Sequence, residues 1–139
     1  AILYGWQLLF KVHATIEENP KKNTPVLVWE ISEADEKRLD CYEGYPVYYH
    51  KRELPVEVFP MDGGEPVQLT AMVYIMAEPL CRQPALPSET YYGIIRRGFK
   101  ENHLPVSSLE DARERTIQAL REERKAVKAV GRSLQKKER

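Results

Sequence analysis

The segment SEADEKRLDCYEGYPVYYH, residues 32–50, joins a helix pattern to a strand pattern through a sharp reversal. Ser32 is a good N-cap, and the acidic residues of the next turn precede the basic ones, which is the charge order that the helix dipole prefers. Gly44 cannot continue the helix, so we expect the helix to end near Tyr42. The segment therefore predicts a helix–turn–strand junction with Glu43 at its corner.

Glu43 is the candidate functional carboxylate because a side chain at such a corner can point into a cleft. Tyrosines at positions 42, 45, 48 and 49 surround it in the sequence. Desolvation by aromatic neighbours raises the pKa of a carboxyl group and makes it a better base. A Glu before a Gly is nevertheless more often a surface charge at a helix end. The residues alone therefore make Glu43 a candidate functional residue but do not indicate which reaction it would catalyse.

The chain before this junction reads as two strands. Residues 2–12 are rich in large apolar side chains that alternate from Trp6 onward, which predicts a strand with a bulge or bend at Gly5. Residues 17–24, EENPKKNT, have the composition of a polar turn. The apolar run at 26–31 predicts a strand buried on both faces. We expect the two strands to pair as a hairpin through the polar turn.

The chain after the junction reads as a second hairpin followed by a helix. Residues 48–59 and 67–76 both alternate, and the MDGGE sequence at 61–65 is a hairpin turn signal. Residues 77–87 contain three prolines and predict an ordered, irregular loop, after which Ser88 can cap a helix. The inner side of that helix is expected to carry Tyr91, Ile94, Ile95 and Gly98.

A last helix is expected to begin after Ser107 or Ser108 and to be mostly charged past roughly Arg124. A thin apolar stripe could dock it on the body: Leu109, Ile117, Leu120, Val127 and Leu134. Its basic end favours a solvated tail that extends away or frays, with a nucleic-acid contact as the alternative. The whole pattern predicts one α+β domain built on a small, mainly antiparallel sheet that may curl into a barrel, with helices outside.

Composition excludes several classes of function. Lys plus Arg and Asp plus Glu both number 21 in the 139 residues, so no net charge attracts nucleic acid or an anionic membrane. No apolar run approaches the ~20 residues of a membrane span, and no signal peptide is recognised. Cys41 and Cys81 indicate a reducing, cytoplasmic setting, although one disulfide stays open. The chain starts abruptly on an apolar run, so we expect further residues before Ala1.

Other chemistries find little support. The three histidines, His13, His50 and His103, lie far apart without metal-ligand spacing, so no metal site is expected. No glycine-rich phosphate loop is present, since Gly63–Gly64 is explained by the hairpin turn. Cys41 is expected to be buried on its helix rather than to act as a nucleophile. Tyrosine hydroxyls in a cleft, by contrast, can hold a polar ligand without adding charge.

The order of these segments resembles the γ-glutamylcyclotransferase-like family over roughly residues 6–112. The matching positions are an aliphatic-Trp strand (Val28-Trp29-Glu30-Ile31), Leu39-Asp40, Glu43-Gly44, Tyr49 with Leu54, Val56 and Val58, Ala71-Met72-Val73-Tyr74, and Tyr91 with Ile94, Gly98 and Leu104-Pro105. Each piece is short, but their order and spacing together are fairly specific. The resemblance divides the chain into a family domain, residues 1–112, and a charged C-terminal helix or tail, residues 113–139.

The resemblance implies a small barrel with outer helices and an enzyme that needs neither metal nor cofactor. The α-amine of a γ-glutamyl amino acid, peptide or amine attacks its own side-chain carbonyl, giving 5-oxoproline and a free amine. The catalytic carboxylate of the family maps onto Glu43, which would act as general acid and base. Tyr49, Tyr91 and Gly44 are assigned to substrate binding. The expected partner is this small molecule, with no nucleic acid and no membrane.

One departure from the family pattern concerns its Tyr-Gly-Ser-Asn type loop, whose backbone N–H groups form an anion cradle. Here Tyr4-Gly5 is followed by Trp6-Gln7 and aligns with the next strand of the family, so the loop, its strand and the following helix are not found in this sequence. We expect them either to precede Ala1 or to be lost, in which case half of the pocket is missing. Each lost donor of this kind typically costs ~10²–10³-fold in rate. A binding or interaction module that kept the scaffold without turnover is therefore the second hypothesis.

Overall fold

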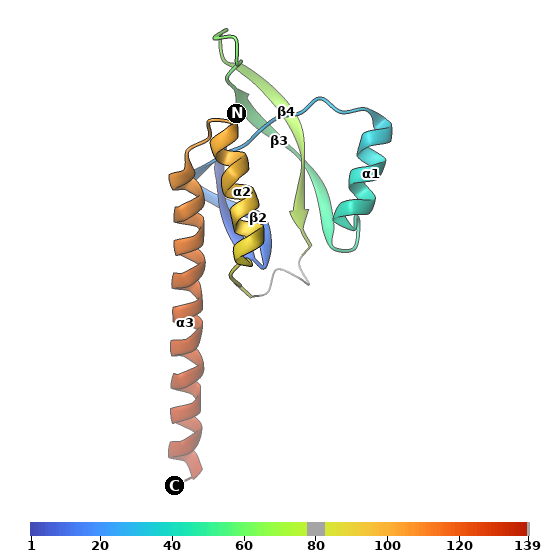
Figure 1. Cartoon of the computed structure of the whole chain (residues 1–139). Coiled ribbons are helices and arrows are strands. Elements are labelled where there is room, and N and C mark those ends of the chain that lie inside the picture. The colour runs from blue at the N-terminus through green and yellow to red at the C-terminus, as the bar shows by residue number, and fades with distance from the viewer. Residues whose placement is uncertain (78–82, 139) are drawn as a thin grey trace.

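The computed structural model describes residues 1–77 and 83–138, which form an α+β fold with a four-stranded sheet and three helices (Figure 1). The elements are β1 (Ile2–Lys11), β2 (His13–Pro25), α1 (Glu33–Glu43), β3 (Tyr49–Val58), β4 (Val67–Met76), α2 (Glu89–Glu101) and α3 (Val106–Glu138). Figure 1 shows α2 and α3 on one side of the sheet and α1 on the other. The predicted fold class is confirmed.

The sheet consists of two antiparallel hairpins in the order β2-β1-β3-β4. The hairpins meet through one register pair, Ile2 with Glu57, and the ladder does not close into a barrel. The backbone N–H of Met76 on β4 does donate to the Thr15 hydroxyl on β2, at 3.2 Å. The sheet therefore curls enough for its two edge strands to form a hydrogen bond. It does not close into the barrel that the sequence pattern allowed.

The first hairpin differs from the prediction. Residues 17–24 are not the hairpin turn, because β1 reverses at Val12 and pairs with β2 on both sides of an irregularity in which residues 19–22 have no partner in the register. The predicted bulge at Gly5 is confirmed by a register shift between Tyr4 and Trp6. An edge strand such as β2 tolerates both proline and a row of charged side chains, since one side of its backbone is unpaired. The turn-like residues 19–22 therefore form an unpaired interruption inside β2 rather than the turn of the hairpin.

The buried strand predicted at 26–31 is also wrong. Val26 still exchanges two backbone hydrogen bonds of 2.9 Å with Ala1, but no described strand continues this pairing, and Trp29 is 73% exposed. Hydrophobicity alone predicted burial here, whereas a strand also needs a neighbouring backbone to satisfy its N–H and C=O groups. The segment instead crosses in irregular conformation to the start of α1.

Two apolar clusters form the core. The first packs β1 against the second hairpin and contains Leu3, Trp6, Leu54, Val56 and Ile75. The second packs the helices on the far end of β1 and contains Phe10, Tyr92, Leu109 and Ala112. The buried face of α2 is therefore shifted by about one residue from the predicted inner side. Tyr92 is buried, whereas Ile94, which was expected to be buried, is 63% exposed.

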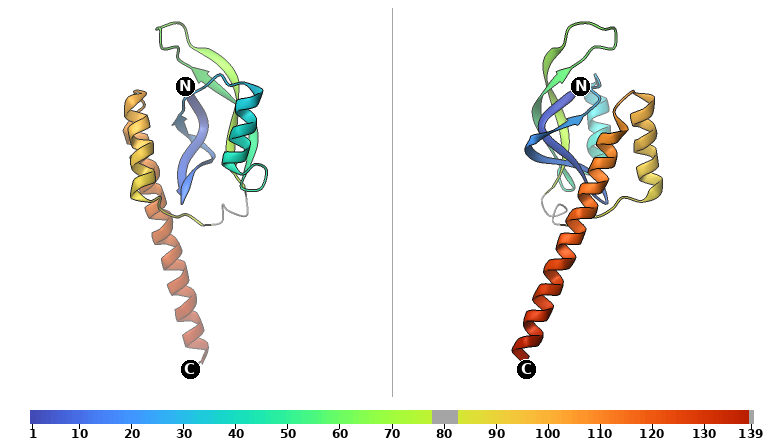
Figure 2. Two further views of the ribbon diagram at one scale, coloured as in Figure 1. Left: turned by 45° about the vertical axis from the view of Figure 1, so that its right-hand side comes forward. Right: turned by 90° about the vertical axis from the view of Figure 1, so that its left-hand side faces the viewer.

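Helix α3 begins at Val106, so Ser107 and Ser108 lie inside its first turn rather than before it. Leu109, Ala112 and Thr116 are buried against the body, whereas Val127 and Leu134 are more than half exposed. Figure 2 shows the second half of the helix running away from the sheet. The prediction that the helix leaves the body past roughly Arg124 is confirmed.

The turns at Gly44 and Gly63 give the first prediction. Both have positive φ, +71° and +82°, but only at Gly44 would an added Cβ run into a side chain, that of Tyr48. The left-handed conformation alone costs an L-residue ~1–2 kcal/mol. Gly44→Ala should therefore lower the free energy of unfolding by more than Gly63→Ala, as measured by urea titration. Equal losses would contradict the close approach of Tyr48 to the turn.

Candidate active site

A cavity of about 780 Å³ lies where the two hairpins, the end of α1 and the start of α2 meet. All four residues that the sequence analysis assigned to the site border it: Glu43, Gly44, Tyr49 and Tyr91. They come from three different elements and from the turn between α1 and β3. Lys11, Val12, His13, Cys41, Tyr42, Tyr48 and Met76 complete its walls.

Helix α1 delivers Glu43 to the cavity because its two ends are fixed locally. At the start, Ser32 and Asp35 form a capping box with two reciprocal hydrogen bonds of 3.1 Å. These bonds lower the pKa of Asp35. At the end, Gly44 takes the left-handed conformation and the Tyr45 N–H donates to the Asp40 carbonyl at 2.9 Å. Glu43 is thus the last helical residue before the chain reverses.

A polar contact then ties α1 to the sheet. Lys51 on β3 lies 2.7 Å from the Asp40 carboxylate, and the hydroxyl of Tyr74 on β4 donates to the same carboxylate at 2.5 Å. The hydrogen bond from Lys51, followed by that from Tyr74, lowers the pKa of Asp40. Burial and the bond to Asp40 raise the pKa of Tyr74. The carboxylate of Asp40 therefore joins the helix to both strands of the second hairpin.

Glu43 itself is partly buried and, in the part of the chain that the structure describes, its carboxylate forms no hydrogen bond or ion pair. Loss of hydration raises its pKa above the ordinary 4.5, and the nearby His13 lowers it in part. A desolvated carboxylate without a fixed partner, facing a cavity, has the features of a candidate base. The arrangement would have been unsuitable if an arginine had neutralised the group.

Tyr91 reaches the cavity from the first turn of α2, which Ser88 caps by accepting a 3.1 Å hydrogen bond from the Tyr91 N–H. Its hydroxyl oxygen accepts a 3.1 Å hydrogen bond from the Ala14 N–H, so the hydroxyl proton can be donated elsewhere. The His13 ring packs edge-on against the Tyr91 ring, with 5.0 Å between centroids. Tyr91 is therefore held in place by β2.

Sequence reasoning missed Lys11 and His13 as residues of this cavity. They flank the reversal at Val12, whereas the prediction placed Lys11 near the end of a strand over residues 2–12 and His13 just beyond it, with the turn at 17–24. Cys41 is exposed with a free thiol, which corrects the expected burial, and Cys81 lies outside the described residues. Tyr4-Gly5 belongs to β1 and does not border the cavity, in agreement with its alignment to a strand.

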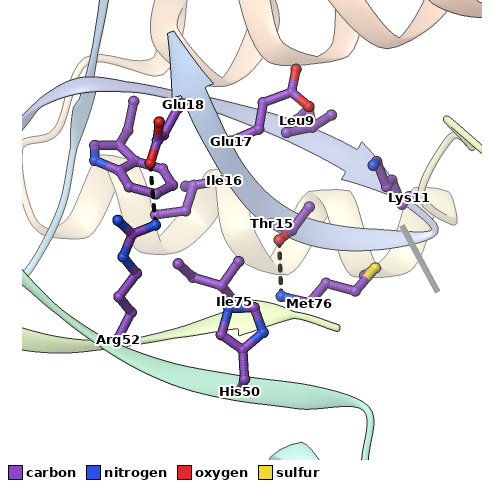
Figure 3. A pocket seen from close by; sticks show the side chains of 11 residues that line it. Leu9, Lys11, Thr15, Ile16, Glu17, Glu18, His50, Arg52, Ile75 and Met76 are labelled. Atoms are coloured by element: carbon purple, nitrogen blue, oxygen red, sulfur yellow. Dashed lines mark hydrogen bonds and ion pairs between the residues drawn. The ribbon is translucent and has the colours of Figure 1, made fainter. Parts of the chain in front are cut away.

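A second, smaller cavity of about 350 Å³ opens between the two hairpins (Figure 3). His50 and Arg52 point into it from β3, on the strand face opposite to Tyr49. Arg52 is paired with Glu18 on β2 at 3.2 Å. Lys11 and Met76 border both cavities, so the two share a wall. Because its arginine already has a carboxylate partner, this cavity is a weaker candidate for chemistry.

Comparison with known proteins identifies the family. A family model described as gamma-glutamyl cyclotransferase, AIG2-like, matches residues 1–93, which is most of the chain. The chain belongs to this family. Neither the comparison with curated proteins nor that with solved structures gives a match. The family resemblance inferred from the sequence is therefore confirmed.

The cyclotransferase match includes every element that borders the larger cavity, from β1 to the first turns of α2, and leaves α3 outside. Within the described residues, no group of three or more His, Cys, Asp or Glu side chains is placed to hold a metal ion. No described helix is long and apolar enough to cross a membrane.

The anchor of α1 predicts a pH dependence of stability. The pKa of Asp40 is lowered from 3.8 in the folded state, so its contacts stabilise the fold above that value and are lost as the pH falls through the folded pKa. Asp40→Asn should therefore lower the free energy of unfolding at neutral pH, and the difference from wild type should shrink as the pH falls below 3.8.

Glu65→Gln is a suitable control, since Glu65 is an exposed carboxylate in the β3–β4 connection. Denaturant titrations at several pH values measure the three proteins side by side. A difference between wild type and Asp40→Asn that stayed constant down to about pH 3 would contradict a contact that depends on the ionised carboxylate.

Proposed function

We propose that the cavity at Glu43 catalyses the cyclisation of a γ-glutamyl amino acid, peptide or amine to 5-oxoproline and a free amine. The supporting observation is the partly desolvated carboxylate of Glu43, which has no hydrogen-bond or ion-pair partner among the described residues, in a cavity that also carries Tyr49 and Tyr91. Membership of the cyclotransferase family supports the reaction class. The substrate and the roles of single residues are our proposals.

The reaction needs one base and one acid, and a single carboxylate can serve as both in turn. Glu43 takes a proton from the α-ammonium group, which turns the amine into a nucleophile. The amine nitrogen attacks the γ-carbonyl carbon, and a new C–N bond closes the five-membered ring. Glu43 returns its proton to the leaving nitrogen, and the bond between that carbon and the leaving nitrogen breaks. The ring nitrogen then gives its second proton through Glu43 to the departing amine, which leaves as an ammonium ion. Atoms and protons balance without a metal or a cofactor.

The environment of Glu43 suits this task. An α-ammonium group has an ordinary pKa of about 8, several units above that of a glutamic acid in water. Partial burial raises the pKa of Glu43 and so reduces the difference between the two pKa values. Proton transfer from the ammonium group to Glu43 is then less unfavourable.

The tyrosines would bind rather than transfer protons. The Tyr91 hydroxyl proton can be donated to a carbonyl or carboxylate oxygen, because its oxygen already accepts from Ala14. Tyr49 lies at the first position of β3, six residues after Glu43, and borders the same cavity. Hydroxyl groups at these positions would orient the γ-glutamyl chain so that amine and carbonyl meet.

Glu43→Gln removes the base and keeps the shape of the side chain. It should lower kcat for 5-oxoproline release by at least ~10²-fold, which is the lower end of the contribution of general acid–base groups. Glu33→Gln, at the other end of α1, is the matched control and should leave turnover unchanged. Equal turnover by wild type and Glu43→Gln would remove Glu43 as the base.

The same assay tests the protonation state. Because the raised pKa of Glu43 belongs to a group that must be ionised, kcat/KM of wild type should rise with pH through a midpoint above 4.5. A midpoint at or below that value would contradict desolvation of the carboxylate. Absence of turnover with γ-glutamyl amino acids, peptides and amines alike would instead favour the binding module without catalysis.

A further inference from the structure

Helix α3 carries a row of charged side chains whose sign reverses halfway along the helix. Residues three or four positions apart lie on the same face of a helix. One such row on α3 consists of Asp111, Glu114, Gln118, Glu122, Lys125, Ala129, Arg132 and Lys136, all of them exposed. The first half of the row contains no Lys or Arg, and the second half contains no Asp or Glu. The row is therefore complementary in charge to its own reverse.

The acidic half of the row borders a cavity beside the body. This cavity of about 540 Å³ lies between α3 and the first hairpin, and its acidic lining residues are Glu17, Asp111, Glu114 and Glu122. Its basic lining residues are Lys22 and Arg115. The Arg115 side chain already donates a 2.7 Å hydrogen bond to the Leu8 carbonyl. The cavity thus presents mainly acidic side chains and favours a basic occupant.

The basic half of the row lies where α3 has left the body (Figure 2). Lys125, Arg132 and Lys136 have no hydrogen-bond or ion-pair partner among the described residues. Like charges four positions apart, such as Arg132 and Lys136, destabilise a helix. An acidic surface laid along this half of α3 would convert that repulsion into attraction.

The apolar side of α3 also continues beyond the body. The docked half of the helix is buried through Leu109 and Ala112. About five turns further on, the same side of the helix carries Val127 and Val130, which are 68% and 60% exposed. The projecting half therefore repeats the side that packs against the body, although its own body does not reach it.

We propose that two copies of this chain pair through antiparallel α3 helices, about a two-fold axis near Glu123. The row then meets its own reverse in three pairs, each formed twice: Asp111 with Lys136, Glu114 with Arg132, and Glu122 with Lys125. The body of one copy lies alongside the projecting half of the other, on the side that carries Val127 and Val130. Both copies use the same surface, as a two-fold dimer requires. The pairing involves a helix outside the family match and does not depend on the proposed function.

The size of this interface fits a specific dimer. Helix α3 has 33 residues and is therefore about 50 Å long. A contact strip about 10 Å wide along its whole length buries about 500 Å² in each copy. The total of about 1,000 Å² reaches the lower limit of specific interfaces before any contact of the bodies is added. Because the pairing relies on exposed charges, the dimer should weaken as salt is added.

The test measures molar mass by light scattering during gel filtration, at about 0.05 M and 0.5 M salt. Wild type should dimerise at low salt, with a Kd that rises at high salt. Asp111→Lys with Glu122→Lys makes the row mainly basic, and Lys125→Glu with Lys136→Glu makes it mainly acidic. Each variant alone should dimerise at least ~10-fold more weakly than wild type. An equimolar mixture of the two variants should form a heterodimer, because opposite charges again face each other.

The matched control is Arg124→Glu with Lys128→Glu, which reverses two exposed charges on the same half of α3 but outside the row. It should dimerise like wild type, and circular dichroism checks that every variant keeps its helix content. Monomeric wild type at low salt would overturn the proposal. So would a dimer that neither row variant weakens, an equal loss in the control, or a mixture that stays monomeric.

An anionic membrane or a nucleic acid would also attract the basic half of α3, but the acidic half of the same row would repel it. Wild type is therefore also incubated with phosphatidylserine vesicles and with duplex DNA. Binding to either by a protein that is monomeric on its own would overturn the proposal in favour of that anionic partner.

Discussion

Helix α1 buries none of its residues, so polar contacts rather than a hydrophobic face decide where Glu43 lies. The Asp40 carboxylate, held by Lys51 and Tyr74, is the main link between the helix and the sheet. Beside it, a cavity of about 520 Å³ separates Leu39 and the segment that contains Trp29 from β4. The candidate base is thus placed by charge, which makes its position sensitive to conditions that ionise or screen these groups.

This dependence explains why the local part of the site was predictable and the rest was not. Ser32, Gly44 and the Asp62–Gly63 turn encode their conformations in the adjacent sequence, through side-chain caps and the left-handed preference of glycine. They suffice to place Glu43 at a corner and Tyr49 at the start of a strand. Tyr91, more than forty residues away, was assigned only through the family resemblance, because no local pattern indicates which face of α2 borders the cavity.

The errors share one physical cause. A valine in left-handed conformation is disfavoured locally, so no sequence rule predicts a reversal at Val12. The Asn-Pro-Lys-Lys-Asn sequence is a much stronger turn signal, yet it lies in an edge strand where polar residues cost little. Misplacing this turn separated Lys11 from His13 and created a strand at 26–31. The sequence analysis therefore did not recognise that Lys11 and His13 are neighbours at the cavity.

The two opposing influences on Glu43 are what a proton-transferring carboxylate needs. Burial without compensation would drive the pKa so high that the group would be protonated at neutral pH and could not accept a proton. Full pairing with a cation would lower the pKa and make the carboxylate a poor base. In Glu43, partial burial raises the pKa and the nearby His13 opposes that rise. Because α1 supplies the carboxylate and the β1–β2 reversal supplies the histidine, the two influences act together where these elements border the cavity, which is where we propose that the reaction takes place.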